Sequence, residues 1–214
     1  MTKKQFAEIL KLLQELNPNA EIELDHTNPF QLLIAVVLSA QSTDKQVNKI
    51  TPAIFEFVKT PQDLLNFGQE WLREKVASIN YNNTKAKNIY QMAETLVEKF
   101  GGEIPKNLED LQSLAGVGRK SANVVLNSAF GIPTLAVDTH VFRVCNRTGL
   151  AKKDGKLAKN VLETELRVFP KIPKEYGLLA HHLLVLHGRY VCKAVKPQCK
   201  TCVIEKFCEK NGII

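Results

Sequence analysis

Apolar residues recur at three- and four-residue intervals along almost the whole chain, and this spacing constrains the fold more than any other feature. In the first such segment, Phe6, Ile9 and Leu13 share one face of a helix. The next segment, PFQLLIAVVLSAQ, starts with a proline and is apolar almost all round. Alternation typical of strands is lacking, and the short run IPTLAV is interpreted as an extended linker. The chain is therefore predicted to be all-α, with about ten or eleven helices.

Prolines and polar clusters indicate where these helices break. Pro52 is expected to kink or split a helix. The polar cluster at residues 80–84 is expected to separate two helices, and a long apolar helix is predicted from Tyr176 to Tyr190. A break near residues 131–133 favours two domains, which a length of 214 residues allows.

The chain carries an excess of positive charge. It has 29 Lys and Arg against 22 Asp and Glu, a formal net charge of +7, which favours a polyanionic partner such as nucleic acid but also suits a merely basic protein. With 44% hydrophobic residues the composition excludes a disordered chain. The N-terminus lacks a signal-peptide core, and the apolar run Leu32–Leu38 is too short to span a bilayer. A cytoplasmic protein is expected.

The segment from Asp110 to Val141 combines backbone and side-chain chemistry most densely. Gly116 and Gly118 lie between two predicted helices, where glycines allow a close approach of the backbone and a helix start suits a phosphate. A tight connection between helices also explains the same glycines, and the spacing alone favours that explanation. Lys120 follows in the first turn, where the helix dipole and the adjacent Arg119 favour a neutral, nucleophilic amine.

Ordinary explanations exist for both charged residues of this segment. Lys120 could be a surface lysine that contacts phosphate, and Asp138 precedes a predicted helix, so it could serve as an N-cap. Local sequence favours these two explanations.

Four of the five cysteines crowd into the end of the sequence, with the spacing Cys-x6-Cys-x2-Cys-x5-Cys: Cys192, Cys199, Cys202 and Cys208. In a chain without a secretory signal, such a cluster indicates a metal centre, and the spacing leaves both zinc and an iron-sulfur cluster open. Three lysines within this loop could meet phosphates: Lys193, Lys196 and Lys200. Cys145 is interpreted as a core residue, and His181, His182 and His187 as structural histidines.

Taken together, the motifs LAGVGRKSA, VDTHVFRV and LSAQSTD and the four-cysteine spacing resemble the endonuclease III family, bacterial bifunctional DNA glycosylases of the helix-hairpin-helix superfamily. The resemblance covers almost the full length. It implies two helical domains that flank a DNA-binding cleft. Residues 22–132 would form a six-helix domain with the helix-hairpin-helix, and residues 1–21 with 133–214 a second domain with a 4Fe-4S cluster held by the four cysteines.

The resemblance also implies the activity: removal of oxidised pyrimidines from duplex DNA and cleavage of the resulting abasic site. Lys120 would attack the sugar C1′ and form a Schiff base, and Asp138 would stabilise cationic character at the sugar and assist proton transfer. The partner would be double-stranded DNA, bound by a monomer. The expected DNA contacts are Gln41, Tyr81, Gly116, Gly118, Arg119, His140, Lys193, Lys196 and Lys200.

Two positions depart from the family pattern. Ala115 replaces the proline usual in the hairpin, and Tyr81 lies where a wedge leucine is often found, so it is expected to stack in that space. Two alternatives are an adenine-type mismatch glycosylase, which usually lacks the lysine and has a further C-terminal domain, and a non-catalytic iron-sulfur DNA-binding module. The latter requires the loss of a catalytic position, and both Lys120 and Asp138 are present.

Overall fold

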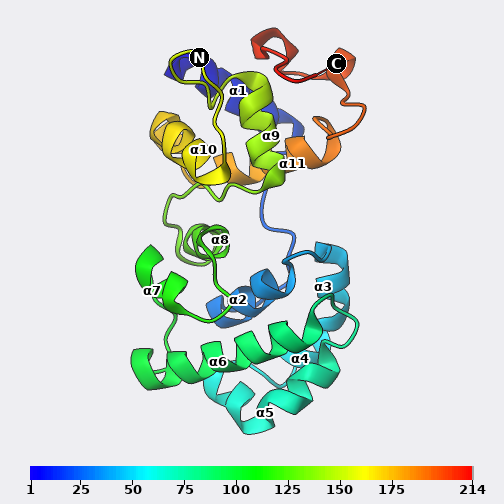
Figure 1. The fold of residues 1–214 in the computed structure, drawn as a ribbon, viewed down its shortest axis with the longest axis vertical. Helices are drawn as coiled ribbons and strands as arrows, with labels where there is room; N and C mark the ends of the chain where they lie inside the picture. Colours follow the sequence, from blue (N-terminus) through cyan, green and yellow to red (C-terminus); the bar gives the residue numbers. More distant parts are fainter. Residues whose placement is uncertain (214) are drawn as a thin grey trace. The chain divides into compact units, whose positions relative to one another are not determined.

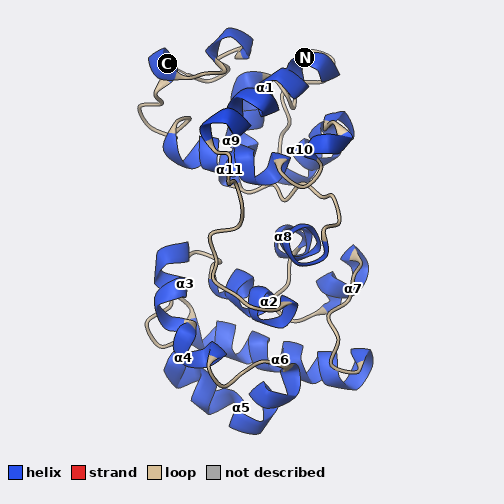
Figure 2. Cartoon of the chain, turned by 180° about the vertical axis from the view of Figure 1, so that it is seen from behind, coloured by secondary structure: helices blue, strands red, loops and turns tan. Residues whose placement is uncertain are grey.

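A computed structural model describes residues 1–213 and confirms the all-α prediction: over these residues it has eleven α-helices, four short 3-10 helices and no strand (Figures 1 and 2). Two compact units divide the chain. The central unit is Glu23–Ile132, and the terminal unit combines Met1–Ile22 with Pro133–Ile214, of which Ile214 lies outside the described residues. Ile22, expected in the domain 22–132, belongs to the terminal unit.

The central unit holds seven α-helices: α2 (Pro29–Leu38), α3 (Asp44–Ile50), α4 (Pro52–Phe55), α5 (Pro61–Lys75), α6 (Asn82–Phe100), α7 (Leu108–Ser113) and α8 (Arg119–Phe130). Helix α2 is buried at every residue after Pro29, as expected for a helix that is apolar all round. It packs against α8, and α5 packs along α6 (Figure 1). Because α2 and α6 also contact one another, the hairpin formed by α7 and α8 rests on a packed core.

The terminal unit holds four α-helices: α1 (Lys3–Leu16), α9 (Thr139–Thr148), α10 (Val161–Val168) and α11 (Ala180–Tyr190). The 3-10 helices also belong to it: η1 (Phe169–Lys171), η2 (Lys174–Tyr176), η3 (Cys199–Thr201) and η4 (Glu205–Phe207). Its core joins Phe6 and Leu13 of α1 to Val144 of α9 and Leu183 of α11, all of them fully buried. Full burial of each such side chain stabilises the folded state by about 1.5–3 kcal/mol.

Short polar side chains fix where several helices begin. Thr2 and Thr60 form capping boxes at α1 and α5, and Asn28 and Asn107 accept hydrogen bonds from backbone N–H groups in the first turns of α2 and α7. Such a cap stabilises a helix by about 1 kcal/mol.

The predicted breaks agree with the structure in part. Pro52 separates α3 from α4, and residues 131–138 form the extended linker. Helix α6 begins at Asn82, inside the polar cluster, because Tyr81 turns the chain in a left-handed conformation directly before it. The helix predicted from Tyr176 begins at Ala180, since the residues before it form η2 and a turn.

Within residues 1–213, no helix has the length and apolar character needed to cross a membrane.

Candidate active site and cysteine loop

The turn between α7 and α8 uses its two glycines differently. Gly116 has a φ of +78°, and a Cβ there would lie 3.0 Å from Cβ of Asn88 on α6 and 3.4 Å from Cγ1 of Val37 on α2. Gly116 therefore permits both the backbone conformation and the close packing of the turn. Gly118 has a φ of −85°, and a Cβ there would have no heavy atom within 4 Å. Its lack of a side chain instead leaves the start of α8 uncovered.

Lys120 lies in the first turn of α8 and is exposed, while Arg119 before it is half-buried. Buried residues of the same helix anchor it to the core: Ala122, Val125 and Leu126. A rigid helix thus carries the lysine amine at its positive end, next to backbone N–H groups that suit an anion. The local structure agrees with the predicted position of Lys120, and its role as nucleophile stays a prediction.

Asp138 caps α9 in the terminal unit. Its Oδ1 accepts a hydrogen bond from the backbone N–H of Val141 at 2.8 Å, so the N-cap explanation is confirmed. A carboxylate has a second oxygen that this cap does not use. Asp138 is only half-buried, so the cap can hold the carboxylate in place while the carboxylate stays accessible to a ligand.

His140 lies in the first turn of α9, at a close crossing with α11. Its Nδ1 lies 3.2 Å from Nη2 of Arg143, and a Cβ on Gly188 of α11 would lie 2.8 Å from Cβ of His140. Gly188 therefore allows α11 to approach the start of α9, next to Asp138. Sequence reasoning missed Gly188, because a glycine inside a helical pattern does not indicate which helix it contacts.

Gln41 and Tyr81 occupy two exposed loops of the central unit, both in left-handed backbone conformations, with φ of 55° and 59°. The two loops are neighbours: the side-chain amide of Asn80 donates to the carbonyl oxygen of Gln41 at 2.9 Å. These two predicted DNA contacts are therefore brought together by a residue that the motifs did not single out.

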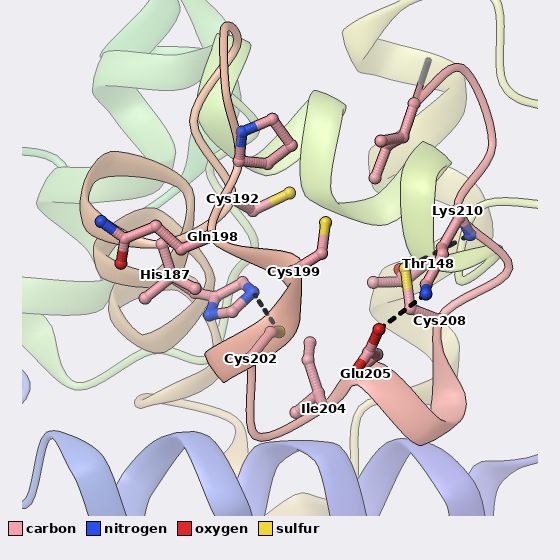
Figure 3. A pocket seen from close by; sticks show the side chains of 13 residues that line it. Thr148, His187, Cys192, Gln198, Cys199, Cys202, Ile204, Glu205, Cys208 and Lys210 are labelled. Atoms are coloured by element: carbon pink, nitrogen blue, oxygen red, sulfur yellow. Dashed lines mark hydrogen bonds and ion pairs between the residues drawn. The ribbon is translucent and has the colours of Figure 1, made fainter.

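The four predicted metal ligands line one hollow in the terminal unit, with His187 and Thr148 among the other lining residues (Figure 3). Cys192 is buried, and Cys199, Cys202 and Cys208 are half-buried. Nε2 of His187 lies 3.7 Å from Sγ of Cys202 (Figure 3). Burial raises the pKa of the Cys202 and Cys208 thiols, and bound metal cations would offset that effect by favouring thiolate.

Two arginines of α9 hold the beginning of the cysteine loop. Arg143 donates through Nη2 to the carbonyl oxygen of Gly188 at 2.7 Å and through Nε to that of Cys192 at 2.9 Å. Arg147 donates to the carbonyl oxygens of Lys193 at 2.6 Å and of Ala194 at 3.0 Å. These contacts join residues more than forty positions apart in sequence, so no local signal could have revealed them.

The remaining predicted loop residues are exposed: Lys193, Lys196 and Lys200. Their position next to the cysteines agrees with the expected positive surface. Cys145 is fully buried in the core, where burial raises its pKa to about 12, so its interpretation as a core residue is confirmed. His181, His182 and His187 are buried on α11, and of these His187 contacts a predicted ligand. Across residues 1–213, no three His, Cys, Asp or Glu side chains converge as ligands of a single metal ion.

Comparison with known proteins agrees with the motifs. Residues 34–171 match the HhH-GPD superfamily of base excision DNA repair proteins. Endonuclease III of Haemophilus influenzae is 50% identical over 209 residues, which cover 98% of this chain and 97% of that protein. Endonuclease III of Escherichia coli K12 is 47% identical over the same shares, and that of Bacillus subtilis is 44% identical over 99% of this chain and 97% of its own.

Solved structures show the same relationship. A trapped endonuclease III–DNA covalent intermediate is 44% identical, with a TM-score of 0.89 over 98% of this chain and 97% of that one. A non-covalent endonuclease III–DNA complex matches with the same identity and TM-score over 98% and 96%. A thermostable thymine-DNA glycosylase, at 22% identity and a TM-score of 0.84, shares the fold. This chain therefore belongs to the endonuclease III family of base excision DNA repair enzymes.

Proposed function

We propose that this enzyme is a bifunctional DNA glycosylase and abasic-site lyase that removes oxidised pyrimidines from duplex DNA, with Lys120 as its nucleophile. The observation that carries the proposal is the exposed Lys120 in the first turn of α8, directly after the glycine turn. Two similar solved structures are endonuclease III–DNA complexes, one non-covalent and one a trapped covalent intermediate. The covalent intermediate supports a nucleophilic mechanism. The sugar C1′ is inaccessible inside a duplex, so the damaged nucleotide must be flipped out.

The amine of Lys120 alone can serve both the removal of the base and the cleavage of the strand. The lone pair of Lys120 forms a bond to C1′, the bond from C1′ to the base breaks, and the departing base takes a proton. Opening of the sugar ring then gives a protonated Schiff base between Nζ and C1′. Loss of a proton from C2′ breaks the C3′–O bond by β-elimination, and water finally hydrolyses the Schiff base and restores the amine.

Asp138 would serve this chemistry as an electrostatic and proton-transfer group. Its Oδ1 accepts from Val141 N–H, so the carboxylate is oriented by its own helix. The second oxygen can face the cationic sugar that develops as the base leaves, and can accept or return protons. Removal of the carboxylate should slow base release more than it weakens DNA binding.

The proposed DNA surface combines backbone amides and cations. The turn at Gly116 and Gly118 would bind phosphate through N–H groups, helped by Arg119. Gln41, Tyr81 and His140 would contact the lesion and its surroundings, and the lysines of the cysteine loop would meet the duplex backbone. A net charge of +7 supports a polyanionic partner. The proposed partner is double-stranded DNA, bound by a monomer.

We propose a 4Fe-4S cluster as the metal centre, held by Cys192, Cys199, Cys202 and Cys208. The donor set fits: four thiols line one hollow, and each iron of such a cluster takes one thiolate. When bound, the cluster supplies a covalent anchor for the loop, and the chain's own residues orient that loop towards phosphates. Purified protein should contain iron and show the visible absorbance of the cluster. Stoichiometric zinc without that absorbance would contradict the assignment.

The cellular site of action follows from the proposed substrate. An enzyme that repairs bacterial DNA is expected in the cytoplasm, associated with the nucleoid by DNA binding. A fluorescent fusion should follow the DNA stain, and a uniform distribution in cells with damaged DNA would contradict this expectation.

Borohydride trapping tests the lysine assignment. Wild-type protein mixed with abasic-site duplex and borohydride should form a covalent adduct, because reduction fixes the Schiff base. Lys120→Ala should form no adduct, while Lys99→Ala, which removes an exposed lysine of α6, should trap like wild type. An adduct with Lys120→Ala would overturn the assignment. A wild-type protein that forms no adduct with the abasic duplex, but releases adenine from a separate duplex with a mispaired adenine, would favour the mismatch-glycosylase alternative.

A further inference from the structure

Two exposed loops of the central unit each carry one residue in a strained backbone conformation. The first, Ser39–Thr43, has Gln41 at a φ of 55°, and the second, Ala77–Tyr81, has Tyr81 at a φ of 59°. Left-handed conformations of residues other than glycine cost about 1–3 kcal/mol and persist where the surrounding structure enforces them. The contacts around the two loops identify what enforces them here.

Side-chain amides join the two loops directly. Nδ2 of Asn80 donates to the carbonyl oxygen of Gln41 at 2.9 Å, across 39 residues of sequence. Nε2 of Gln46, on α3 behind the first loop, donates to the carbonyl oxygen of Ser78 at 2.5 Å. The first bond fixes the two loops to one another, and the second fixes the loop Ala77–Tyr81 to α3.

Lys85 forms hydrogen bonds to both loops. Its side chain is 6% exposed, and its Nζ donates to the carbonyl oxygen of Leu38 at 2.8 Å and to Oγ of Ser42 at 3.2 Å, on either side of Gln41. Its backbone N–H donates to the carbonyl oxygen of Tyr81 at 2.9 Å. A single buried residue therefore contacts the first loop through its side chain and the second through its backbone.

The exposed side chains of Gln41 and Tyr81 on these two loops have complementary chemistry. Tyr81 is 66% exposed and offers an aromatic face, while Gln41 is exposed and offers an amide donor and acceptor. A flipped nucleotide leaves a gap in the duplex, where a ring can stack on the neighbouring bases and an amide can bond to the edge of the base left opposite. Two side chains at a fixed separation suit these two tasks.

We propose that Asn80 is a positioning residue that holds Gln41 and Tyr81 as one two-pronged element, which enters the duplex where the damaged nucleotide is flipped out. The inference rests on the proposed function, because it requires nucleotide flipping. Asn80 acts through the Gln41 backbone and need not contact DNA. Its removal should leave Gln41 and Tyr81 present but no longer aligned, so that binding to the gapped duplex weakens and discrimination between opposite bases declines.

Three substitutions separate the hydrogen bond from the size of the side chain. Asn80→Asp keeps the shape but replaces the donor by a carboxylate that faces the carbonyl of Gln41, and Asn80→Ala removes the bond altogether. Asn80→Gln keeps an amide donor and should restore part of the function. Asn83→Ala is the matched control, since Asn83 is exposed on the first turn of α6 and its side chain makes no hydrogen bond to any described residue.

The experiment uses the full-length, cluster-loaded protein and a duplex with a tetrahydrofuran abasic analogue opposite 2-aminopurine, whose fluorescence rises when it is unstacked. Wild type and Asn83→Ala should raise the fluorescence. Asn80→Asp and Asn80→Ala should lose most of that rise and bind about fivefold to tenfold more weakly, as expected for one lost hydrogen bond and a displaced neighbour. Cleavage at saturating abasic DNA should stay within about twofold of wild type, and the unfolding midpoint within about 2 °C.

The outcomes distinguish a failure of the proposed function from a failure of the positioning role of Asn80. If wild type neither traps with borohydride nor changes the fluorescence, the proposed function fails. If wild type does both, and Asn80→Asp and Asn80→Ala behave like Asn83→Ala, the function stands and the positioning role is wrong. A loss of folding in Asn80→Ala and Asn80→Asp, with no recovery in Asn80→Gln, would also overturn the positioning role, because Asn80 would then be a structural residue.

Discussion

Nη1 of Arg147 lies 3.7 Å from the sulfur of Cys192 and donates to the carbonyl oxygen of Lys193 at 2.6 Å. A cationic hydrogen-bond donor thus meets the first proposed ligand and the backbone that follows it. The carbonyl oxygen of Arg147 in turn accepts from Asn211 N–H at 3.1 Å and from the Cys208 thiol at 3.4 Å. One residue of α9 therefore contacts both ends of the cysteine loop.

Arg147→Ala should loosen this loop. The substitution removes charged donors to two carbonyl oxygens and a sulfur, and it should lower the free energy of unfolding by about 2 kcal/mol. Iron should also leave faster when a chelator is added, measured as the decay of the visible absorbance. Arg73→Ala is the control, because Arg73 is an exposed residue of α5 that pairs with Glu70. Equal rates of iron loss in both variants would show that Arg147 does not hold the loop.

Gly116→Ala and Gly118→Ala should differ in stability. The first forces alanine to a φ of +78° with its Cβ 3.0 Å from Cβ of Asn88, which should cost about 1–3 kcal/mol. The second adds a methyl group in open space at an ordinary φ, and should change stability by less than about 0.5 kcal/mol. Urea unfolding of the pair tests this difference.

DNA binding gives a second measurement on the same pair. Gly118→Ala should weaken DNA binding despite its normal stability, if the start of α8 approaches a phosphate closely. A Gly118→Ala protein that binds abasic duplex like wild type would exclude that approach.

Enlarging Gly188 should disturb the start of α9. A Cβ at this position would lie 2.8 Å from Cβ of His140 and 3.2 Å from its backbone, so α9 and α11 must move apart. Gly188→Ala should destabilise the protein by about 1–3 kcal/mol, and Gly188→Val by more. Because His140 is two residues from Asp138, base release should slow as well. Unfolding and single-turnover glycosylase assays measure the two effects, and a stability that rises with side-chain size would contradict the crossing.

Acid should destabilise the protein through a buried histidine. Burial lowers the pKa of His182 from 6.5 to about 4, so the unfolded chain binds a proton more readily than the folded one between these values. The stability contributed by neutral His182 is full above pH 6.5 and is lost progressively as the pH falls to about 4. The loss should reach about 3 kcal/mol.

His182→Gln should flatten this dependence, since glutamine does not titrate. Urea unfolding between pH 4 and 7 compares the two proteins, and His187, whose pKa burial also lowers to about 4, should account for part of the slope that remains. An unchanged slope in His182→Gln would show that His182 does not carry the effect.

Sequence patterns predicted those parts of the molecule that depend on neighbouring residues. Helical spacing predicted the all-α fold, Pro52 predicted the separation of α3 from α4, and the fully apolar segment predicted the burial of α2. The four cysteines could be assigned to one loop because they are close in sequence. Asp138 could be assigned as an N-cap for the same reason.

Contacts between distant segments could not be predicted in this way. Asn80 meets Gln41 and Arg147 meets Lys193 only because the fold brings loops and helices together. An asparagine in a polar cluster predicts a turn, and an arginine in the last turn of a helix suits the helix dipole, so both residues already had sufficient local explanations. The predicted start of α11 was wrong by four residues because Leu178 and Leu179, which lie in a turn, continue the apolar pattern of the helix that follows them.

The terminal unit is built from two separated stretches of chain, and this sets an order for folding during synthesis. Phe6 and Leu13 of α1 are fully buried against α9 and α11, which leave the ribosome more than a hundred residues later. The contiguous central unit can form its core as soon as Ile132 emerges, in line with the tendency of domains to fold as units during translation. The apolar face of α1 must stay in water or on a chaperone until α11 is made. Newly made chains should therefore be most prone to aggregation in the interval between these two events.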